Sequence, residues 1–408
     1  MKKLWNKWTD IALVKRILVG LILGAILGIA VPGATGIAIL GDVFVSALKA
    51  IAPLLVFFLV ISSLCNAVKS HGGVIKTVII LYMFSTVLAG VIAVFASMAF
   101  PVKLTLATAA TTDAAAPQGI VEVLNNLLLN LVANPVSSLV NANYVGILTW
   151  AILLGLALRT ANDTTKKVLA DIADGTSLVV SWIINLAPFG IFGLVFNTVS
   201  TNGLDIFTTY GRLLLLLVGS MLFIYFVTNP LLAYWFIRKN PYPLILHCLK
   251  KSAITAFFTR SSAANIPVNM KACEEMGLDR DTYSVTIPLG ATINMDGAAI
   301  TITVMTMATA FTLGIHVDIP TAIILSRLAA LSACGASGVA GGSLLLIPMA
   351  CSLFGISDDI SMQVVAVGFI IGVIQDSVET ALNSSSDLLL SASAEFRQWR
   401  LEGKEIKF

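Results

Sequence analysis

An apolar stretch from Ile287 to Leu313, long enough to cross a bilayer, is interrupted by the polar sequence GATINMDG at 290–297. A continuous membrane helix satisfies its own backbone groups, so a glycine-flanked polar break at mid-depth is tolerated only where it lines a cavity inside the protein. The carboxylate of Asp296 alone costs roughly 2.5 to 3.5 kcal/mol at the centre of a membrane helix. A bound cation would compensate both this charge and the carbonyls that an opened helix frees. The segment therefore predicts a buried cation site, and the alternative is a loop between two short helices of a soluble protein.

The composition favours the membrane interpretation. Of the 408 residues, 57% are hydrophobic and only 12% are charged, whereas soluble domains carry about 25% charged residues. The chain is therefore predicted to be an all-α polytopic membrane protein. Its net charge of +3 is small and its basic residues lie in short loops, which argues against nucleic acid as a partner. The five cysteines show no CxxC spacing, so buried thiols are expected in place of disulfides or metal ligands.

Further apolar stretches bring the number of predicted membrane-spanning helices to about eight. In chain order, the predicted spans are 17–31, 43–68, 74–100, 121–159, 177–200, 213–237, 286–313 and 362–391. The fourth is predicted to be subdivided, because Asn-Pro at 134–135 and the asparagines at 141 and 143 break it. Residues 102–119 are predicted to form an external loop. Lys and Arg concentrate on the side of the N-terminus, which predicts that both termini are cytoplasmic.

Two other segments have apolar arms that are each too short for a span, with small and polar residues between them. They are residues 243–276, with a tip at 259–264, and residues 320–355, with a tip at 334–343. Each is predicted to be a re-entrant helical hairpin, the first entering from the cytoplasm and the second from outside. Each precedes a polar-interrupted span, so the chain is predicted to contain an inverted repeat with a midplane binding site. The alternative is two loops of small residues where helices pack closely.

Five polar residues lie on one face of the last predicted span. They stand at i, i+3, i+4, i+7 and i+11 and are Asp376, Glu379, Thr380, Asn383 and Asp387. The three carboxylates repel one another, so cationic partners are expected nearby. The candidates are Arg260, a substrate ammonium group and metal cations. Ligation by oxygen alone suits a hard cation, so sodium is the first candidate for a coupling ion and the proton is the second.

Together these segments resemble the dicarboxylate/amino acid:cation symporters, the glutamate-transporter-like family, across most of the chain. The resemblance rests on TRSS at 259–262, PLGATINMDG at 288–297, the glycine-rich second tip, and the pattern D-x-x-x-T-x-x-N-x-x-x-D at 376–387. Within the family, the chain is most similar to members that carry serine and threonine with sodium. The resemblance implies a multi-pass transporter of the bacterial inner membrane and not an enzyme. It also implies sodium as coupling ion, no organic cofactor, and a small amino acid and the lipid bilayer as partners.

The same resemblance implies an architecture. Residues 1–408 would form one transmembrane unit of a homotrimer. A scaffold of about 11–68 and 119–200 would hold a transport part of about 74–101 and 210–392. The transport part would include both hairpins and would move across the membrane like an elevator.

Carried over by position, the resemblance implies three sodium sites. The first would comprise Asp387 and the carbonyls of Gly290, Asn294 and Asn383; the second, the Thr292 carbonyl and residues 333–336; and the third, Asp296, the Asn294 side chain, Tyr82, Ser85 and Thr86. The substrate's amino group would meet Asp376, and its carboxylate would meet Asn383 and the region of Ser262. Thr380 would add a further polar contact.

Three positions depart from the members that carry acidic substrates. Glu379 stands where those members have arginine, Ala298 stands where they have threonine after NMDG, and Ala340 replaces a proline in the second tip. A buried substrate carboxylate needs a fixed cation, and Arg260 is expected to be engaged already by nearby carboxylates. The first two departures therefore argue against aspartate and glutamate.

A small neutral side chain avoids repulsion from Glu379. A substrate hydroxyl could donate to Glu379, or pair with Thr380 or Ser343, which favours serine and threonine. The alternatives are a sodium- or proton-coupled symporter of acidic amino acids or dicarboxylates with the same fold and, more remotely, an ion channel.

Overall fold

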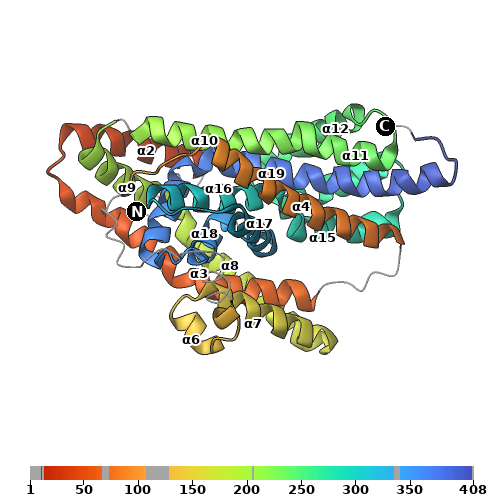
Figure 1. Ribbon diagram of the computed structural model, residues 1–408, viewed down its shortest axis with the longest axis horizontal. Helices are drawn as coiled ribbons and strands as arrows, with labels where there is room; N and C mark the ends of the chain where they lie inside the picture. Colours follow the sequence, from red (N-terminus) through yellow and green to blue (C-terminus); the bar gives the residue numbers. More distant parts are fainter. Residues whose placement is uncertain are drawn as a thin grey trace.

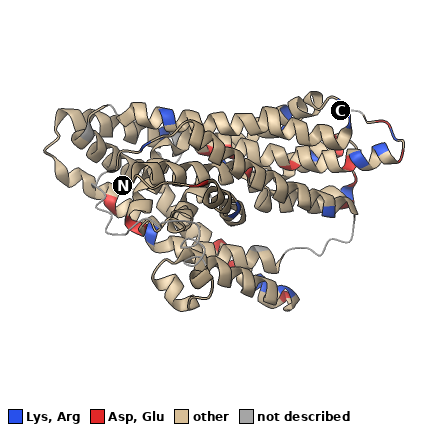
Figure 2. Ribbon diagram, in the orientation of Figure 1, with Lys and Arg blue, Asp and Glu red and all other residues tan. Residues whose placement is uncertain are grey.

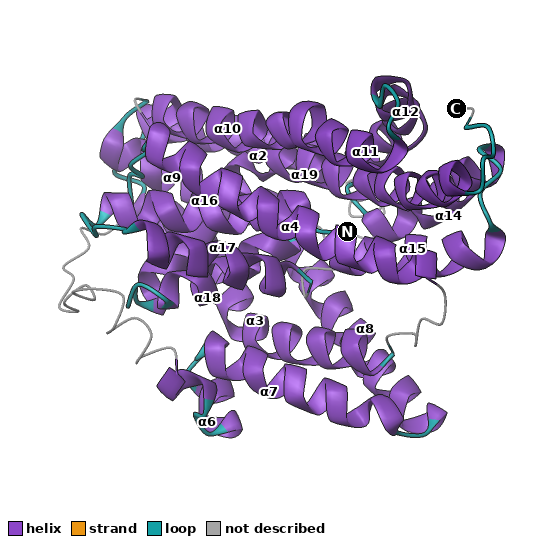
Figure 3. Cartoon of the chain, turned by 45° about the vertical axis from the view of Figure 1, so that its right-hand side comes forward, coloured by secondary structure: helices purple, strands orange, loops and turns teal. Residues whose placement is uncertain are grey.

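The structure is a computed structural model of the chain, and it describes residues 11, 13–66, 73–106, 128–204, 206–334 and 341–406. The regular structure of these residues is helical, as predicted, and no strand occurs among them (Figure 1, Figure 3). Six helices in the described part are long and apolar enough to cross a membrane: Thr35–Ser62, Gly73–Ala99, Asp163–Asn185, Ile206–Ile237, Arg280–Thr312 and Asp358–Leu401. Figure 2 shows Lys and Arg gathered toward the ends of the long helices, with acidic residues among the few charges in between.

One group of helices packs around α3 (Ile39–Cys65). Its other members are α2 (Leu13–Ala30), α6 (Pro135–Val140), α7 (Tyr144–Ala157), α8 (Asp163–Asn185) and α9 (Ala187–Asn202). Glycines at every fourth position allow α2 to lie directly on the backbone of α9. A Cβ atom added at Gly24 would stand 2.6 Å from the Phe192 carbonyl oxygen, and one at Gly28 would stand 3.0 Å from that of Phe196. Small residues at this spacing are how membrane helices approach closely.

A second group packs around α16 and the long helix α19. Its members are α4 (Gly73–Ala99), α10 (Ile206–Phe223), α11 (Asn229–Ile237), α12 (Tyr242–Cys248), α13 (Ile254–Thr259), α14 (Ser262–Glu275), α15 (Arg280–Ile293), α16 (Asp296–Thr312), α17 (Ile319–Ala333), α18 (Ile347–Ser352) and α19 (Asp358–Leu401). α10 and α11 belong to one continuous helix from Ile206 to Ile237. The two groups meet at an edge-to-face ring pair, Phe44 with Phe369, whose centroids are 5.4 Å apart.

The first predicted hairpin is helical and turns back more sharply than predicted. Only Arg260 and Ser261 separate α13 from α14, in place of a tip over 259–264. Arg260 makes the turn with a left-handed backbone (φ 54°), and the Ser261 hydroxyl caps α14 by accepting a hydrogen bond from the Ala264 backbone N–H. The two arms are joined where Asn265 Nδ2 donates to Ser252 Oγ at 2.9 Å.

The first hairpin is also attached to α19 through two amides. Asn265 Nδ2 donates to Ser384 Oγ at 2.8 Å, and Asn269 Nδ2 donates to the Ser384 backbone carbonyl at 2.9 Å. All three residues are buried. Both arms of the hairpin are therefore connected, directly or through one side chain, to a single position on α19.

The second predicted hairpin is helical on both arms. α17 begins after Asp318, whose carboxylate caps it by accepting from the Thr321 backbone N–H at 2.8 Å. The returning arm comprises the short helix Gly342–Leu346 and α18. Its predicted tip is described only at Cys334 and from Gly341 onward, so Ala336 and Ala340 lie outside the described residues, as does most of the predicted external loop at 102–119.

The predicted fifth span, 177–200, is wrong in its extent. Two consecutive helices, α8 and α9, occupy 163–202, and Asn162 caps α8 by accepting from the Thr165 backbone N–H at 2.8 Å. The first turns of α8 carry Asp, Thr and Lys, so hydropathy alone did not identify them as helix. The division falls at Leu186, and Pro188 stands in the first turn of α9, where a proline is tolerated because its missing N–H needs no helical partner.

The prediction of a polar-interrupted last span is wrong as well. α19 is one unbroken helix of 44 residues. Several of its serines, namely Ser377, Ser385 and Ser393, donate to carbonyls of the preceding turn, so their polarity is satisfied without opening the backbone. By contrast, the other predicted break is confirmed, because α15 ends at Ile293 and α16 begins at Asp296.

Candidate substrate and cation site

The break between α15 and α16 brings its own polar groups against α19. Asn294 Nδ2 donates to Asp387 Oδ1 at 2.9 Å, and both residues are buried. Gly290 permits this approach: a Cβ atom there would stand 2.7 Å from Asp387 Oδ1. The first predicted sodium group, Gly290, Asn294, Asn383 and Asp387, is thus brought together, since Asn294 Nδ2 also lies 3.4 Å from the Asn383 carbonyl oxygen.

Two of the backbone N–H groups that the break frees are satisfied by side chains from two other helices. The Met295 N–H donates to Thr86 Oγ1 on α4 at 3.2 Å, and the Gly297 N–H donates to Asn383 Oδ1 on α19 at 2.7 Å. Helix N-termini otherwise leave such donors without partners. The break is therefore a built feature that α4 and α19 hold open.

Asp296 lies at the N-terminus of α16 and faces α4. Its carboxylate accepts hydrogen bonds from Ser85 Oγ at 2.8 Å and from Thr86 Oγ1 at 3.2 Å, and it is buried. The positive end of the α16 dipole also favours a negative charge there. Ser85, Thr86 and Asp296, predicted to share a sodium site, do lie together.

Tyr82, predicted to join Asp296, directs its phenol elsewhere. The Tyr82 hydroxyl lies 2.9 Å from the Asp387 carbonyl oxygen, 2.7 Å from Ser391 Oγ and 3.3 Å from the Thr286 carbonyl oxygen. Tyr82 therefore ties α4 to α15 and α19, and its backbone carbonyl oxygen lies 2.9 Å from Thr86 Oγ1.

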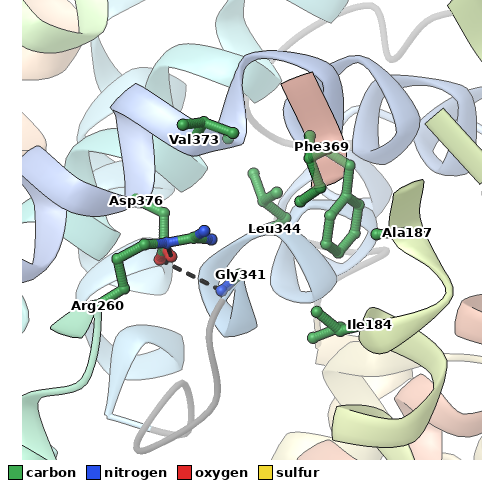
Figure 4. Close-up of a pocket in the computed structure, with 10 residues that line it drawn as sticks. Ile184, Ala187, Arg260, Gly341, Leu344, Phe369, Val373 and Asp376 are labelled. Carbon is green, nitrogen blue, oxygen red and sulfur yellow. Dashed lines mark hydrogen bonds and ion pairs between the residues drawn. The ribbon is translucent and has the colours of Figure 1, made fainter. Parts of the chain in front are cut away.

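Asp376 connects the two hairpins, as Figure 4 shows. Arg260 Nε donates to Asp376 Oδ2 at 2.6 Å, and the Gly341 backbone N–H donates to Oδ1 at 3.2 Å. The side chains of Arg260 and Asp376 are 12% and 5% exposed. The cationic partner expected near the carboxylate stripe is thus Arg260, and its ion pair is shielded from water. Apolar side chains, including Leu344, Phe369 and Val373, line the small cavity beside it.

Glu379 lies one turn further along α19, in a cluster of uncharged donors. Its Oε2 accepts from Thr301 Oγ1 at 2.6 Å, from Ser343 Oγ at 3.0 Å and from Gln375 Nε2. Glu379 is buried and packs on α16, since a Cβ atom at Gly297 would stand 2.9 Å from the Glu379 Cα. Two carboxylates one turn apart thus have different surroundings: a guanidinium for Asp376 and neutral hydroxyls and an amide for Glu379.

Sequence reasoning placed Ser262, Thr292 and Thr380 at the site without fixing their contacts. Ser262 and Thr380 are buried, the first at the start of α14 beside Arg260 and the second next to Glu379. Thr292 Oγ1 donates to the Leu289 carbonyl of its own helix at 2.8 Å. The backbone carbonyl of Thr292 lies in the last turn of α15, next to the break.

Sequence reasoning missed two of the residues around Glu379. Gln375 had a signal, because it stands one turn before Glu379 on the same face, whereas nothing in the sequence distinguished Thr301 from the other threonines of its apolar helix. The seryl run on α19 was also missed. Ser386 accepts from Asn229 Nδ2 of α11 at 2.8 Å, and both residues are buried.

The residues around the break suit a hard cation. Among the described residues, Asp387 Oδ2 and Asn294 Oδ1 are buried oxygens without a hydrogen-bond partner, and they belong to two residues that bond each other. Buried acceptors of this kind are costly unless something satisfies them. Sodium and other hard cations bind such oxygens. No group of three or more His, Cys, Asp or Glu placed to hold a metal occurs in the described ranges, so the site's other ligands would be amide and backbone oxygens.

A comparison with protein families settles the class of the chain. Residues 13–395 match the model of the sodium:dicarboxylate symporter family. The chain belongs to that family. The matched region contains the broken helix, both hairpins and the polar face of α19, so the site lies wholly within what defines a sodium:dicarboxylate symporter.

Several curated relatives in the symporter family are similar over almost their whole length. The serine/threonine transporter SstT of Streptococcus thermophilus is 56% identical over 400 residues, covering 98% of this chain and 100% of the relative. The SstT of Streptococcus agalactiae is 59% identical over 395 residues, covering 97% and 98%. The SstT of Bifidobacterium adolescentis is 58% identical over 396 residues, covering 97% and 92%. Together with the six long apolar helices, this family membership identifies a multi-pass membrane transporter.

A larger hollow lies away from the site, between α4 and α10. It has a volume of about 830 Å³ and is lined mostly by apolar residues, including Phe95 and Phe223, with Arg212 among them. It contains none of the buried carboxylates. For a symporter of an amino acid and a cation, the small polar site at the hairpin tips is therefore the better candidate.

Proposed function

We propose that this protein imports serine and threonine across the bacterial cytoplasmic membrane in symport with sodium. The observation that carries the proposal is the environment of Glu379. The residue expected to face the substrate side chain is a carboxylate among neutral donors, while the nearby guanidinium of Arg260 is paired with Asp376. An acidic substrate would bring a second negative charge to Glu379. A small neutral side chain with a hydroxyl does not. The relatives named serine/threonine transporters support the same substrate class.

The amino group of the substrate binds at Asp376, where Arg260 now lies. A substrate ammonium can replace the Arg260 guanidinium as the positive partner of this carboxylate. Because the Gly341 N–H is bonded to the same carboxylate, the exchange alters the polar contacts of both hairpin tips. The substrate carboxylate then lies near Asn383 and the N-terminal end of α14 at Ser262, where the helix dipole favours a negative charge. Thr380 supplies a further polar contact.

Sodium enters as a second substrate at three places. The first ion is held by Asp387 and the carbonyls of Gly290, Asn294 and Asn383. The second is held by the Thr292 carbonyl and residues 333–336. The third is held by Asp296, Ser85, Thr86, the Tyr82 carbonyl and the Asn294 side chain. Asn294 belongs to the first and third of these sodium sites, and Asn383 belongs to the first sodium site and to the substrate site. Coupling follows from this sharing, because an ion that fixes Asn383 also fixes a ligand of the amino acid.

The wider architecture is part of the proposal. The group around α3 is the scaffold of a homotrimer, and the group around α16 and α19 is the transport part, which moves as an elevator. With the hairpins re-entrant, the chain has eight spans and both termini in the cytoplasm. Reporter tags inserted at residue 110 and at the C-terminus then report opposite compartments, and tags in the same compartment would contradict this topology.

The test of the function is uptake into vesicles that contain the purified protein. Labelled serine and threonine should accumulate when a sodium gradient is imposed, and a proton gradient alone should not replace it. Excess unlabelled serine and threonine should suppress uptake, whereas aspartate and glutamate should not. Equal competition by aspartate would overturn the interpretation of Glu379 and make Arg260 the side-chain anchor. Uptake driven by protons alone would favour a proton-coupled symporter, and current without saturable uptake would favour a channel.

A further inference from the structure

The hydrogen bonds around Glu379 have a fixed direction. Gln375 Nε2 lies against two oxygens, Thr301 Oγ1 at 2.7 Å and Glu379 Oε2, and an amide nitrogen can only donate to both. Because Thr301 Oγ1 accepts from Gln375, its own hydrogen is directed to Glu379 Oε2, 2.6 Å away. Gln375 and Thr301 thus act on Glu379 as one unit.

These donors all end on the same carboxylate oxygen. Within the described part of the chain, the three hydrogen bonds to Glu379 come from Thr301, Ser343 and Gln375, and each is accepted by Oε2. A carboxylate oxygen with three donors has no further lone pair to offer. A new donor that approaches this side chain must therefore use Oε1.

The side chain of Glu379 cannot readily move away from these three donors. A Cβ atom at Gly297 would stand 2.9 Å from both the Cα and the Cγ of Glu379, so α16 lies directly against this side chain. Rotation would also break three hydrogen bonds in a buried site, where a carboxylate without partners is costly. The carboxylate plane is therefore held by α16 on one side and by its own helix on the other.

We propose that Gln375 and Thr301 are positioning residues that saturate Glu379 Oε2 and so present Oε1 as the acceptor for the hydroxyl of a serine or threonine substrate. The inference rests on the proposed function and names the side-chain determinant of the same site. A hydroxyl that donates to a carboxylate makes a charge-assisted hydrogen bond, which is stronger than a neutral one. Alanine, which lacks the hydroxyl, leaves Oε1 without this donor and binds more weakly.

The experiment compares serine, threonine and alanine as competitors of labelled serine uptake in vesicles. Thr301→Val keeps the shape of the side chain and removes the hydroxyl, and Gln375→Leu removes the amide. In both variants the apparent affinity for serine and threonine should fall roughly tenfold, the loss expected for one hydrogen bond to a charged group. The affinity for alanine should change less than about twofold, so the serine-over-alanine preference should largely disappear. Thr301→Ser retains a hydroxyl and should restore the preference.

A matched control lies on the same helix. Thr303 is also buried in α16, and its hydroxyl has no hydrogen-bond partner among the described residues. Thr303→Val should leave all three affinities unchanged. The ratio of serine to alanine affinity does not depend on how much folded protein is present, so poor expression of one variant does not obscure the result.

An equal loss of serine and alanine affinity in Thr301→Val and Gln375→Leu would overturn the inference, because it would show a purely structural role. A preference that survives in both variants would overturn it as well. If the parent protein took up no serine at all under a sodium gradient, the proposed function itself would fail, and that result is distinct from a change of preference in the variants.

Discussion

Two helical segments cross the polar centre of this protein, and their backbones respond to polarity in opposite ways. The segment of α15 and α16 opens at Asn294 and Met295, and two of its freed N–H groups are satisfied by Thr86 and Asn383 from other helices. The segment of α19 carries more polar side chains, yet it remains one helix from Asp358 to Leu401. Glycine and proline flank the first region, in Pro288, Gly290 and Gly297, whereas the polar face of α19 contains neither.

The difference separates two ways of making a site inside a membrane. An opened backbone offers carbonyl oxygens, which suit cations, and it requires partners for every freed N–H. An intact helix offers side chains at fixed spacing, which suit the recognition of a particular substrate. The cation ligands predicted for this chain accordingly cluster at and beside the break, and most of the predicted substrate contacts lie on α19. Asp387 belongs to both, because it stands on α19 opposite Gly290.

The largest effect is expected where the two segments meet. Asp387→Asn keeps the size of the side chain but removes the negative charge beside Asn294. Breaking a buried charged pairing costs about 3 to 5 kcal/mol, so the sodium concentration for half-maximal serine uptake should rise by roughly 100-fold or more. Asp359→Asn, at the exposed end of α19 where Asp359 pairs with Lys49, serves as the control and should have no such effect. An unchanged sodium titration in Asp387→Asn would exclude Asp387 as a ligand.

A smaller loss is expected when the open segment is crowded. In Gly290→Ala the added methyl group would stand 2.7 Å from Asp387 Oδ1 and 2.9 Å from the Tyr82 hydroxyl oxygen. Overpacking of this kind costs about 1 to 3 kcal/mol, and sodium affinity should fall with it, by roughly tenfold or more. Gly211→Ala in α10 is the matched control, because nothing lies within 4 Å of the new atom. Equal sodium titrations of the two variants would show that the break does not bind the ion.

The hydrogen bonds of Tyr82 that connect the two segments are expected to have a smaller effect on stability. Tyr82→Phe removes the hydroxyl that bonds the Asp387 carbonyl and Ser391 while keeping the ring. The free energy of unfolding should fall by about 1 kcal/mol, the usual contribution of one hydrogen bond. A thermal melt in detergent measures this, with Tyr234→Phe, on the exposed face of α11, as the control. An unchanged melting temperature in Tyr82→Phe would mean that the segments are held together without this phenol.

The smallest effect is expected within α19 itself. Ser385 Oγ donates to carbonyls of its own helix, at Ala381 and Leu382. Ser385→Ala should therefore change the free energy of unfolding by less than about 0.5 kcal/mol. Ser384→Ala removes an acceptor from two buried amides and should cost more, about 1 to 3 kcal/mol. If the two neighbouring serines had equal effects in a thermal melt, the difference between backbone-bonded and cross-helix polarity would not hold.

The sequence predicted those features that have a local cause. Glycines beside Asn294 and Asp296 indicated the break, small residues indicated both hairpins, and the spacing of the carboxylates indicated the polar face of α19. The start of α8 was not predicted, because its first turns are polar and its helix is identified by the Asn162 cap. Thr301 was not predicted as a partner of Glu379, since a threonine in an apolar helix has the same pattern whether it packs or bonds. Thr301 bonds Glu379 because α16 packs against α19 at this position, and the sequence of α16 alone does not show this packing.

The amides that fasten the first hairpin to Ser384 have a mechanical consequence. Asn265 and Asn269 donate hydrogen bonds to Ser384 of α19, and these bonds involve neither a carboxylate nor a ligand. The first hairpin is therefore expected to move together with α19. The second hairpin is bonded to α19 through hydrogen bonds to carboxylates. Gly341 and Ser343 donate to Asp376 and Glu379, the two carboxylates proposed to bind the substrate. The first hairpin therefore keeps its amide contacts with Ser384 even if a substrate displaces Arg260 from Asp376, whereas, among the described residues, the polar contacts of the second hairpin with α19 all end on Asp376 and Glu379.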